Sequence, residues 1–114
     1  MNFGCPARKV VTKASGSALM RHESLCADIF ETVRAAISVP LTVKMRLGWD
    51  DQSFNAPKLA KMAEESGLNG ITVHGRTRCQ FYKGHADWTK VGEVRRATWR
   101  GTPVAASGCS RFTY

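Results

Sequence analysis

The chain has 114 residues, of which 43% are hydrophobic, so it can form a core without the disulfides on which very small secreted domains depend. Its 17 lysines and arginines against 9 acidic residues give a net charge of +8, which favours either a polyanionic partner or simply a well-solvated surface. It contains no run of about 18 apolar residues, which excludes a membrane span, and no secretory signal. Its cysteines form no Cys-x-x-Cys pair, which argues against structural zinc and favours a reduced, cytoplasmic setting.

The chain opens on a short motif, Asn2–Pro6, that places a thiol in a tight turn. Gly4 permits a positive φ and a close backbone approach to a ligand, while Pro6 fixes the φ angle that follows. Cys5 is therefore held in a defined direction beside the amide of Asn2. The motif predicts either a functional thiol or, as for most free cysteines, a small buried hydrophobic residue.

Helical and strand patterns alternate after this turn. Apolar residues three and four positions apart predict a first helix between residues 19 and 37, followed by a buried strand over 40–46. The second helix has clear boundary signals. Asn55 is expected as its N-cap, Pro57 in its first turn and Gly67 as its left-handed C-cap.

A strand over 70–74, a third helix over 88–98 with Asp87 as its cap, and a strand over 102–106 continue the alternation. No hairpin signal interrupts it, which predicts an α/β fold with parallel strands joined by right-handed crossovers. The strand ends are spaced by roughly 30 to 40 residues, which fits four units of a (β/α)8 TIM barrel. A doubly wound sheet is the alternative. Four units leave two sheet edges open, so the isolated chain is expected to be unstable or to self-associate.

Polar residues mark the carboxyl end of every predicted strand, which is where parallel α/β folds bind ligands. These residues are Asn2 and Cys5, Lys44 and Arg46, His74 and Arg76, and Ser107 and Gly108. Lys44 ends an otherwise apolar strand, which is costly unless it faces a ligand or forms a structural ion pair with Asp50 or Glu64. His74 alone is typical of a hydrogen-bonded core histidine, but its matching place on the next strand also favours a ligand contact.

Basic and aromatic residues are interleaved over positions 75–88, in the loop expected after the third strand. Arg76 and Arg78, with the aromatic residues that follow, are the groups that grip phosphates and stack on bases. The alternative is an ordinary charged loop whose aromatic side chains pack on the barrel rim. The sequence contains no glycine-rich loop of the Rossmann or P-loop type, no His-Glu-x-x-His and no Gly-x-Ser-x-Gly. Nucleotide binding through these motifs is therefore excluded.

Several of these motifs together resemble the tRNA-dihydrouridine synthase family, most closely its bacterial B-type branch. They occur in the family's order and spacing from residue 2 to about residue 108, and they comprise Asn2–Ala7 with Lys9–Val10, Gly16–Met20, Val43–Trp49, and Val73–Arg78 with Gly84 and Ala86–Trp88. The resemblance implies that residues 1–114 form part of a flavin-binding TIM barrel, roughly strands 4 to 7 with their helices. The N-terminal strands, the last strand and a C-terminal helical domain of the family are then absent.

The resemblance also implies an activity and its participants. Enzymes of this family use NADPH to reduce bound FMN, and hydride then passes to C6 of a uracil base in tRNA. Cys5 matches the family's general acid, which protonates C5 of that base. A thiol is mostly protonated at neutral pH, so it can neutralise the negative charge that develops there. No metal and no membrane is implied.

Two groups of binding residues follow from the same resemblance. Contacts to the flavin are implied for Lys44, His74, Ser107 and Gly108. Contacts to the RNA substrate are implied for Asn2, Arg46, Arg76 and Arg78. The family's Asn-Gly-Asp sequence reads Ser107-Gly108-Cys109 in this chain, so only the glycine is kept.

Other functions are compatible with parts of this pattern. The chain is alternatively an inactive truncated fragment that at most binds RNA through its basic loops, or an RNA-binding piece that has lost its flavin. Another flavin barrel, such as dihydroorotate dehydrogenase, also carries an Asn-x-x-Cys-Pro turn. The run His74–Arg78 argues against that last alternative.

Overall fold

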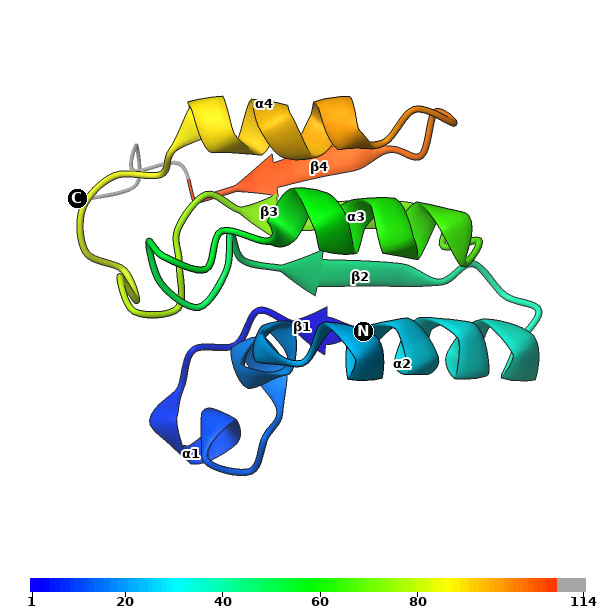
Figure 1. Ribbon diagram of the computed structural model, residues 1–114, viewed down its shortest axis with the longest axis horizontal. Coiled ribbons are helices and arrows are strands. Elements are labelled where there is room, and N and C mark those ends of the chain that lie inside the picture. The colour runs from blue at the N-terminus through cyan, green and yellow to red at the C-terminus, as the bar shows by residue number, and fades with distance from the viewer. Residues whose placement is uncertain (109–114) are drawn as a thin grey trace.

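Four parallel strands form a sheet in the computed structural model, which describes residues 1–108 (Figure 1). The strands lie side by side in chain order, and every neighbouring pair is parallel. They are β1 (Asn2–Phe3), β2 (Thr42–Met45), β3 (Gly70–His74) and β4 (Val104–Ser107). The α/β class and the parallel arrangement expected from the sequence are therefore confirmed.

Helices connect the strands, and the three longest of them form one layer. The helices are α1 (Arg8–Val11), the 3-10 helix η1 (Gly16–Arg21), α2 (Glu23–Ala36), α3 (Ala56–Glu65) and α4 (Trp88–Ala97). Because α2 packs on α3 and α3 packs on α4, each crossover steps to the next strand in the same direction. Barrel units wind in this way, whereas a doubly wound sheet reverses direction. Among residues 1–108, no helix is long and apolar enough to cross a membrane.

The helix expected between residues 19 and 37 is shorter than predicted. Leu19 belongs to η1, and His22 leaves the helical conformation with φ −127° and ψ 76° before α2 begins. Ile37 is already extended, with φ −131° and ψ 150°. Apolar residues three or four apart pack equally well from a 3-10 turn followed by a helix, so the periodicity alone did not reveal the break.

The predicted helix boundaries are confirmed in part. Asp87 caps α4 by accepting a hydrogen bond from the Lys90 N–H at 3.0 Å, and Gly67 ends α3 with φ +88°. Asn55 precedes α3, but its side chain makes no cap hydrogen bond. Its Nδ2 donates instead to the Met20 carbonyl (2.8 Å) and to Glu23 Oε1 (3.1 Å). Asn55 therefore ties α3 to the segment before it, which the sequence pattern did not indicate.

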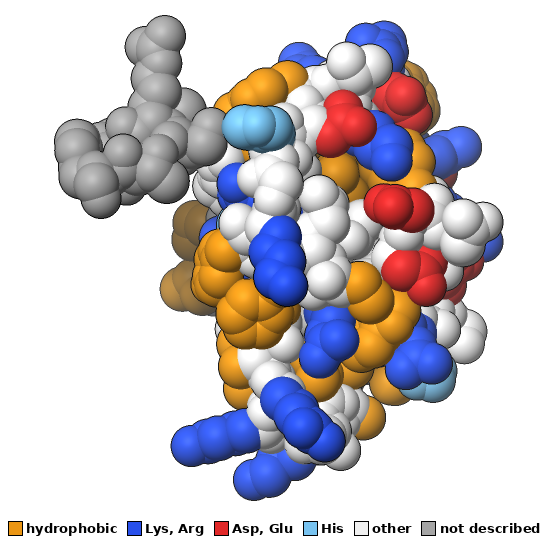
Figure 2. Space-filling view, turned by 90° about the vertical axis from the view of Figure 1, so that its left-hand side faces the viewer, with side chains coloured by type: hydrophobic (Ala, Val, Ile, Leu, Met, Phe, Trp, Pro, Cys, Tyr) orange, Lys and Arg blue, Asp and Glu red, His pale blue; other side chains and the backbone are white. Residues whose placement is uncertain are grey.

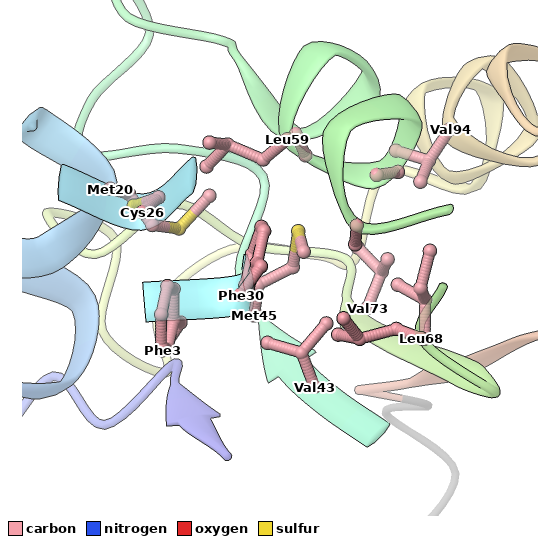
Figure 3. Close-up of a cluster of buried hydrophobic side chains, with 14 of the residues drawn as sticks. Phe3, Met20, Cys26, Phe30, Val43, Met45, Leu59, Leu68, Val73 and Val94 are labelled. Atoms are coloured by element: carbon pink, nitrogen blue, oxygen red, sulfur yellow. The ribbon is translucent and has the colours of Figure 1, made fainter. Parts of the chain in front are cut away.

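The helices bury one face of the sheet. On β2, Val43 and Met45 are buried under the helices, whereas Thr42 and Lys44, at alternate positions, are exposed. The buried side chains continue into α2, where the Phe30 ring stacks on Phe3 with centroids 5.2 Å apart (Figure 3). The carboxyl ends of the strands share one side of the molecule, which is the side that faces the viewer in Figure 2.

Candidate active site

Five of the residues predicted from the sequence line one pocket of about 440 Å³. They are Asn2, Cys5, Lys44, Arg46 and His74, accompanied by Gly4, Pro6 and Tyr82. The convergence of strand-end residues expected from the α/β pattern is therefore confirmed for β1, β2 and β3. The sequence placed Tyr82 only among several aromatic residues of a loop. Its place in the pocket depends on how that loop folds back, which the sequence pattern does not show.

Hydrogen bonds on both sides hold the backbone of Cys5. The side-chain oxygen of Asn2 accepts hydrogen bonds from the N–H groups of Gly4 and Cys5, both at 3.0 Å. The Cys5 carbonyl accepts two more, from the backbone N–H (3.0 Å) and the hydroxyl (2.9 Å) of Ser17. Cys5, which lines the pocket, is thus part of a turn that is fixed from both sides. Ser17 is a supporting residue that the sequence motifs did not identify.

The glycine that this turn needs in the left-handed region is Gly16, not Gly4. Gly4 does not have the positive φ expected of it. A Cβ at Gly4 would lie 3.4 Å from the backbone carbonyl carbon of Met45, on the neighbouring strand. Gly16 has φ +59°, and a Cβ there would lie 2.7 Å from the Cys5 carbonyl oxygen. The approach of η1 to the Cys5 turn therefore requires a residue without a side chain.

Lys44 faces the pocket without a carboxylate partner among the residues that the structure describes. The only ion pair found within residues 1–108 joins Lys58 to Glu23. Glu64 instead accepts hydrogen bonds from backbone N–H groups between α4 and β4, including those of Trp99 and Arg100. The alternative of a structural ion pair for Lys44 is therefore wrong. Its ammonium group is available to an anionic ligand.

Arg46 is almost entirely buried, with 1% of its surface exposed, and it joins two loops. Its Nε donates to the Gly4 carbonyl at 3.0 Å, on the Cys5 turn. Its Nη1 donates to the carbonyls of Thr77 (3.0 Å) and Phe81 (2.5 Å), in the loop after β3. The guanidinium also lies 5.3 Å from the Tyr82 ring. Arg46 thus holds the pocket walls together, and its contact with a substrate stays a prediction.

His74 is neutral in this environment. Burial, followed by the positive charges of Arg46, Lys44 and Arg76, lowers the pKa of the imidazole from 6.5 to about 4. The His74 Nε2 lies 3.1 Å from the Arg76 Nη1. A guanidinium can only donate, so Nε2 is the acceptor and the ring proton is on Nδ1.

This shift makes the protein less stable at mildly acidic pH. Because the folded-state pKa of His74 is lower than that of the unfolded chain, the unfolded state binds the proton first and stability is lost as pH falls from 6.5 towards 4. We expect the thermal midpoint of a His74→Gln variant to fall less than that of the parent across this window. An NMR titration of the His74 ring with a midpoint near 6.5 would contradict the assignment.

Ser107 and Gly108 lie beside His74 but are not among the residues that line the pocket. Ser107 pairs with His74 in the sheet, and its hydroxyl oxygen is buried without a hydrogen-bond partner within residues 1–108. A Cβ at Gly108 would lie 2.6 Å from the His74 ring. Cys109, the next residue of that motif, lies outside the described residues. The flavin contacts of Ser107 and Gly108 remain predictions.

The remaining predicted arginines lie outside the pocket. Arg76 is buried, and its side chain donates to the carbonyls of Lys83 (3.2 Å) and Gly84 (3.0 Å), so it shapes its own loop. Arg78 stacks on Trp49, with its guanidinium carbon 4.7 Å from the ring centroid. RNA contacts by Arg76 and Arg78 therefore stay predictions.

The surface around the pocket is predominantly basic. Figure 2 shows many Lys and Arg side chains on the side where the strands end, while the acidic side chains in view lie along one edge. Such a surface attracts polyanions through long-range electrostatics. Within residues 1–108 no group of three His, Cys, Asp or Glu side chains lies close enough together to hold a metal ion.

Comparison with known proteins gives a consistent result. The family model described as "Dihydrouridine synthase (Dus)" matches residues 1–109. A "Probable tRNA-dihydrouridine synthase" of Rickettsia bellii is 60% identical over 108 residues, and one of Rickettsia conorii is 58% identical. A "tRNA-dihydrouridine synthase B" of Pseudomonas putida is 44% identical. Each match covers 95% of this chain but only 32% of the relative, so the chain spans about a third of their length. The chain belongs to the dihydrouridine synthase family.

Proposed function

We propose that this chain is the central part of an FMN-dependent tRNA-dihydrouridine synthase. The enzyme reduces the C5=C6 bond of a uridine in tRNA, with NADPH as the ultimate hydride donor. The observation that carries the proposal is the pocket in which Asn2, Cys5, Lys44 and His74 meet, in a chain of this family. A tRNA substrate and free cysteines fit a cytoplasmic protein.

In this proposal the four βα units are roughly strands 4 to 7 of a flavin-binding TIM barrel. The sequential strand order and the single helix layer support it, because both are properties of barrel units. The strands that complete the barrel then pair with β1 and β4, the edges of the described sheet. In the isolated chain these edges are free to pair with a second copy, which is the basis for expecting self-association.

Several features of the chain fit FMN. Lys44 offers an ammonium group with no carboxylate partner within residues 1–108, which suits the negative charge of a reduced isoalloxazine. The buried Ser107 hydroxyl lacks a partner in the same residues, so it can hydrogen-bond to a ligand. Neutral His74 adds no further positive charge beside Lys44, Arg46 and Arg76. When bound and reduced, FMN supplies the hydride.

The protein groups then handle the base and the proton. The Asn2 side-chain oxygen is occupied by the Cys5 turn, which leaves its NH₂ to donate to a uracil carbonyl. As hydride reaches C6, negative charge develops at C5, and the Cys5 thiol donates its proton there. The resulting thiolate regains a proton from solvent. The target base must leave its stack to enter the pocket.

A chimaera tests the proposal with a complete barrel. The 108 matched residues replace their counterparts in the Rickettsia bellii relative, which supplies the rest of the chain. We expect the purified chimaera to show the visible absorbance of bound flavin and, with NADPH, to form dihydrouridine in unmodified tRNA, as measured by nucleoside mass spectrometry. The unmodified relative is the matched control.

Two outcomes would contradict the proposal. A folded, flavin-loaded chimaera that reduces no uridine, beside an active control, argues against the catalytic function of this chain. A folded chimaera that binds tRNA but no flavin favours the RNA-binding alternative instead.

A further inference from the structure

Arg76 lies beside the candidate active site, and the protein itself uses all three nitrogens of its guanidinium group. The residue is only 7% exposed. Its Nε donates to the Lys83 carbonyl at 3.2 Å, and its Nη2 donates to the Gly84 carbonyl at 3.0 Å. Its Nη1 lies 3.1 Å from the His74 Nε2 and 3.5 Å from the Gly108 carbonyl oxygen. A guanidinium group with these partners has little capacity left for a phosphate of the substrate.

The contact with Arg76 determines where the proton of neutral His74 lies. A neutral imidazole has one N–H and one acceptor nitrogen, and the nitrogens of a guanidinium group only donate. Nε2 is therefore the acceptor, and the ring proton is on Nδ1. The other tautomer would place two N–H groups against each other across a distance of 3.1 Å.

Gly108 covers the same edge of the imidazole ring. A Cβ at this residue would lie 2.6 Å from the His74 Cδ2 and 2.8 Å from its Nε2, so the backbone of Gly108 runs close to both atoms. Within residues 1–108 no hydrogen bond to Nδ1 is found, whereas Nε2 has Arg76 as its partner. The ring atoms that remain for the pocket lined by His74 are therefore Nδ1 and Cε1.

Lys44 offers a second donor to the same space. It is paired in register with Thr72, and His74 follows two residues later on the same face of β3. Lys44 and His74 both line the pocket of about 440 Å³. A ligand that contacts both side chains meets one ammonium group and one ring N–H, so it must present hydrogen-bond acceptors there. The carbonyl and phosphate oxygens of FMN are such acceptors.

We infer that Arg76 is a positioning residue of the flavin site, which holds His74 as the Nδ1–H tautomer so that the ring donates a hydrogen bond to an acceptor atom of FMN. The inference rests on the proposed function, from which it takes FMN as the ligand. It gives Arg76 a role in cofactor binding, through His74, in place of the RNA contact that the sequence predicts. Arg76 itself touches neither the flavin nor the base.

The position of the ring proton is measured by ¹⁵N NMR of the flavin-free chimaera at neutral pH, where the imidazole is uncharged. Comparison with a His74→Gln variant assigns the signals. We expect an N–H at Nδ1 and an unprotonated Nε2. Addition of FMN should slow the exchange of the Nδ1 proton with water, because the flavin accepts its hydrogen bond. A proton on Nε2 in the parent chimaera would overturn the inference, whether or not the chimaera forms dihydrouridine.

The variant Arg76→Met removes the donor that selects this tautomer. We expect the proton of His74 to be shared between both ring nitrogens, and FMN to bind about tenfold more weakly, which corresponds to about one hydrogen bond. Lys83→Met removes an equal charge from an exposed position of the same loop. It is the matched control and should keep the parental proton position and FMN affinity.

Thermal melting shows whether Arg76→Met is folded, and the proton position in the parent decides the question if it is not. A folded Arg76→Met with parental FMN affinity would overturn the inference. So would weaker FMN binding with the proton still on Nδ1, because Arg76 would then act only through the shape of its loop. A loss of tRNA affinity alone would favour an RNA contact instead. A chimaera that binds FMN with the proton on Nδ1 but reduces no uridine contradicts the proposed function and supports this inference.

Discussion

Replacing Cys5 with alanine in the chimaera is expected to lower the rate of dihydrouridine formation by about 100- to 10,000-fold, the usual contribution of a general acid. Without the thiol, the charge that develops at C5 of the uracil has no proton donor at that face of the base. The side chain is partly exposed and lines the pocket, so its loss should affect chemistry more than folding. Single-turnover formation of dihydrouridine in unmodified tRNA measures the effect directly.

The chain offers matched controls for this variant. Cys79 is an exposed thiol in the loop after β3, and Cys79→Ala should react at the parental rate. Cys26 is fully buried, and burial raises the pKa of its thiol to about 11, so it is an unreactive core residue. Affinity for tRNA should stay the same in Cys5→Ala, because the substitution removes no Lys or Arg contact to the phosphates, which dominate RNA affinity. Dihydrouridine formation at the parental rate in Cys5→Ala would disprove the general-acid role.

The largest effect on stability is expected from Arg46→Met. This change leaves the carbonyls of Gly4, Thr77 and Phe81 without their donor inside the protein. Each buried polar group without a partner costs about 1–3 kcal/mol, and we expect a total loss of about 3–5 kcal/mol after local relaxation. Since whole domains are stable by only about 5–15 kcal/mol, this is a large fraction.

The thermal midpoint of the chimaera should then fall by roughly 5–10 °C. Arg46→Lys keeps the charge, but a lysine cannot reach three carbonyls in two loops. The thermal midpoint of Arg46→Lys should therefore lie between those of the parent and Arg46→Met. Arg21→Met, an exposed arginine, serves as the control and should change the midpoint little. A midpoint for Arg46→Met within error of the parent would show that the two loops do not depend on this side chain.

Much of the fold follows from local patterns in the sequence. The runs around β2 and β3 are short, apolar and bounded by glycine or proline, and Asp87 and Gly67 mark helix ends through contacts with their own neighbours. The carboxyl-end position of Lys44 and His74 follows from the parallel arrangement itself. These features depend on residues close in the chain, so the sequence alone determines them.

The tertiary structure decided the roles that depend on long-range contacts. Arg46 was expected to bind substrate, yet its hydrogen bonds reach residues 42 positions earlier and 31 to 35 positions later in the chain. Asn55 was expected as a cap and instead bonds to Met20 and Glu23. These partners belong to different βα units, so they depend on how the units pack together. A local sequence pattern does not contain the distances between the units. The sequence determined which polar groups reach the ends of the strands, and the packing of the loops decided which of them face the pocket and which hold it together.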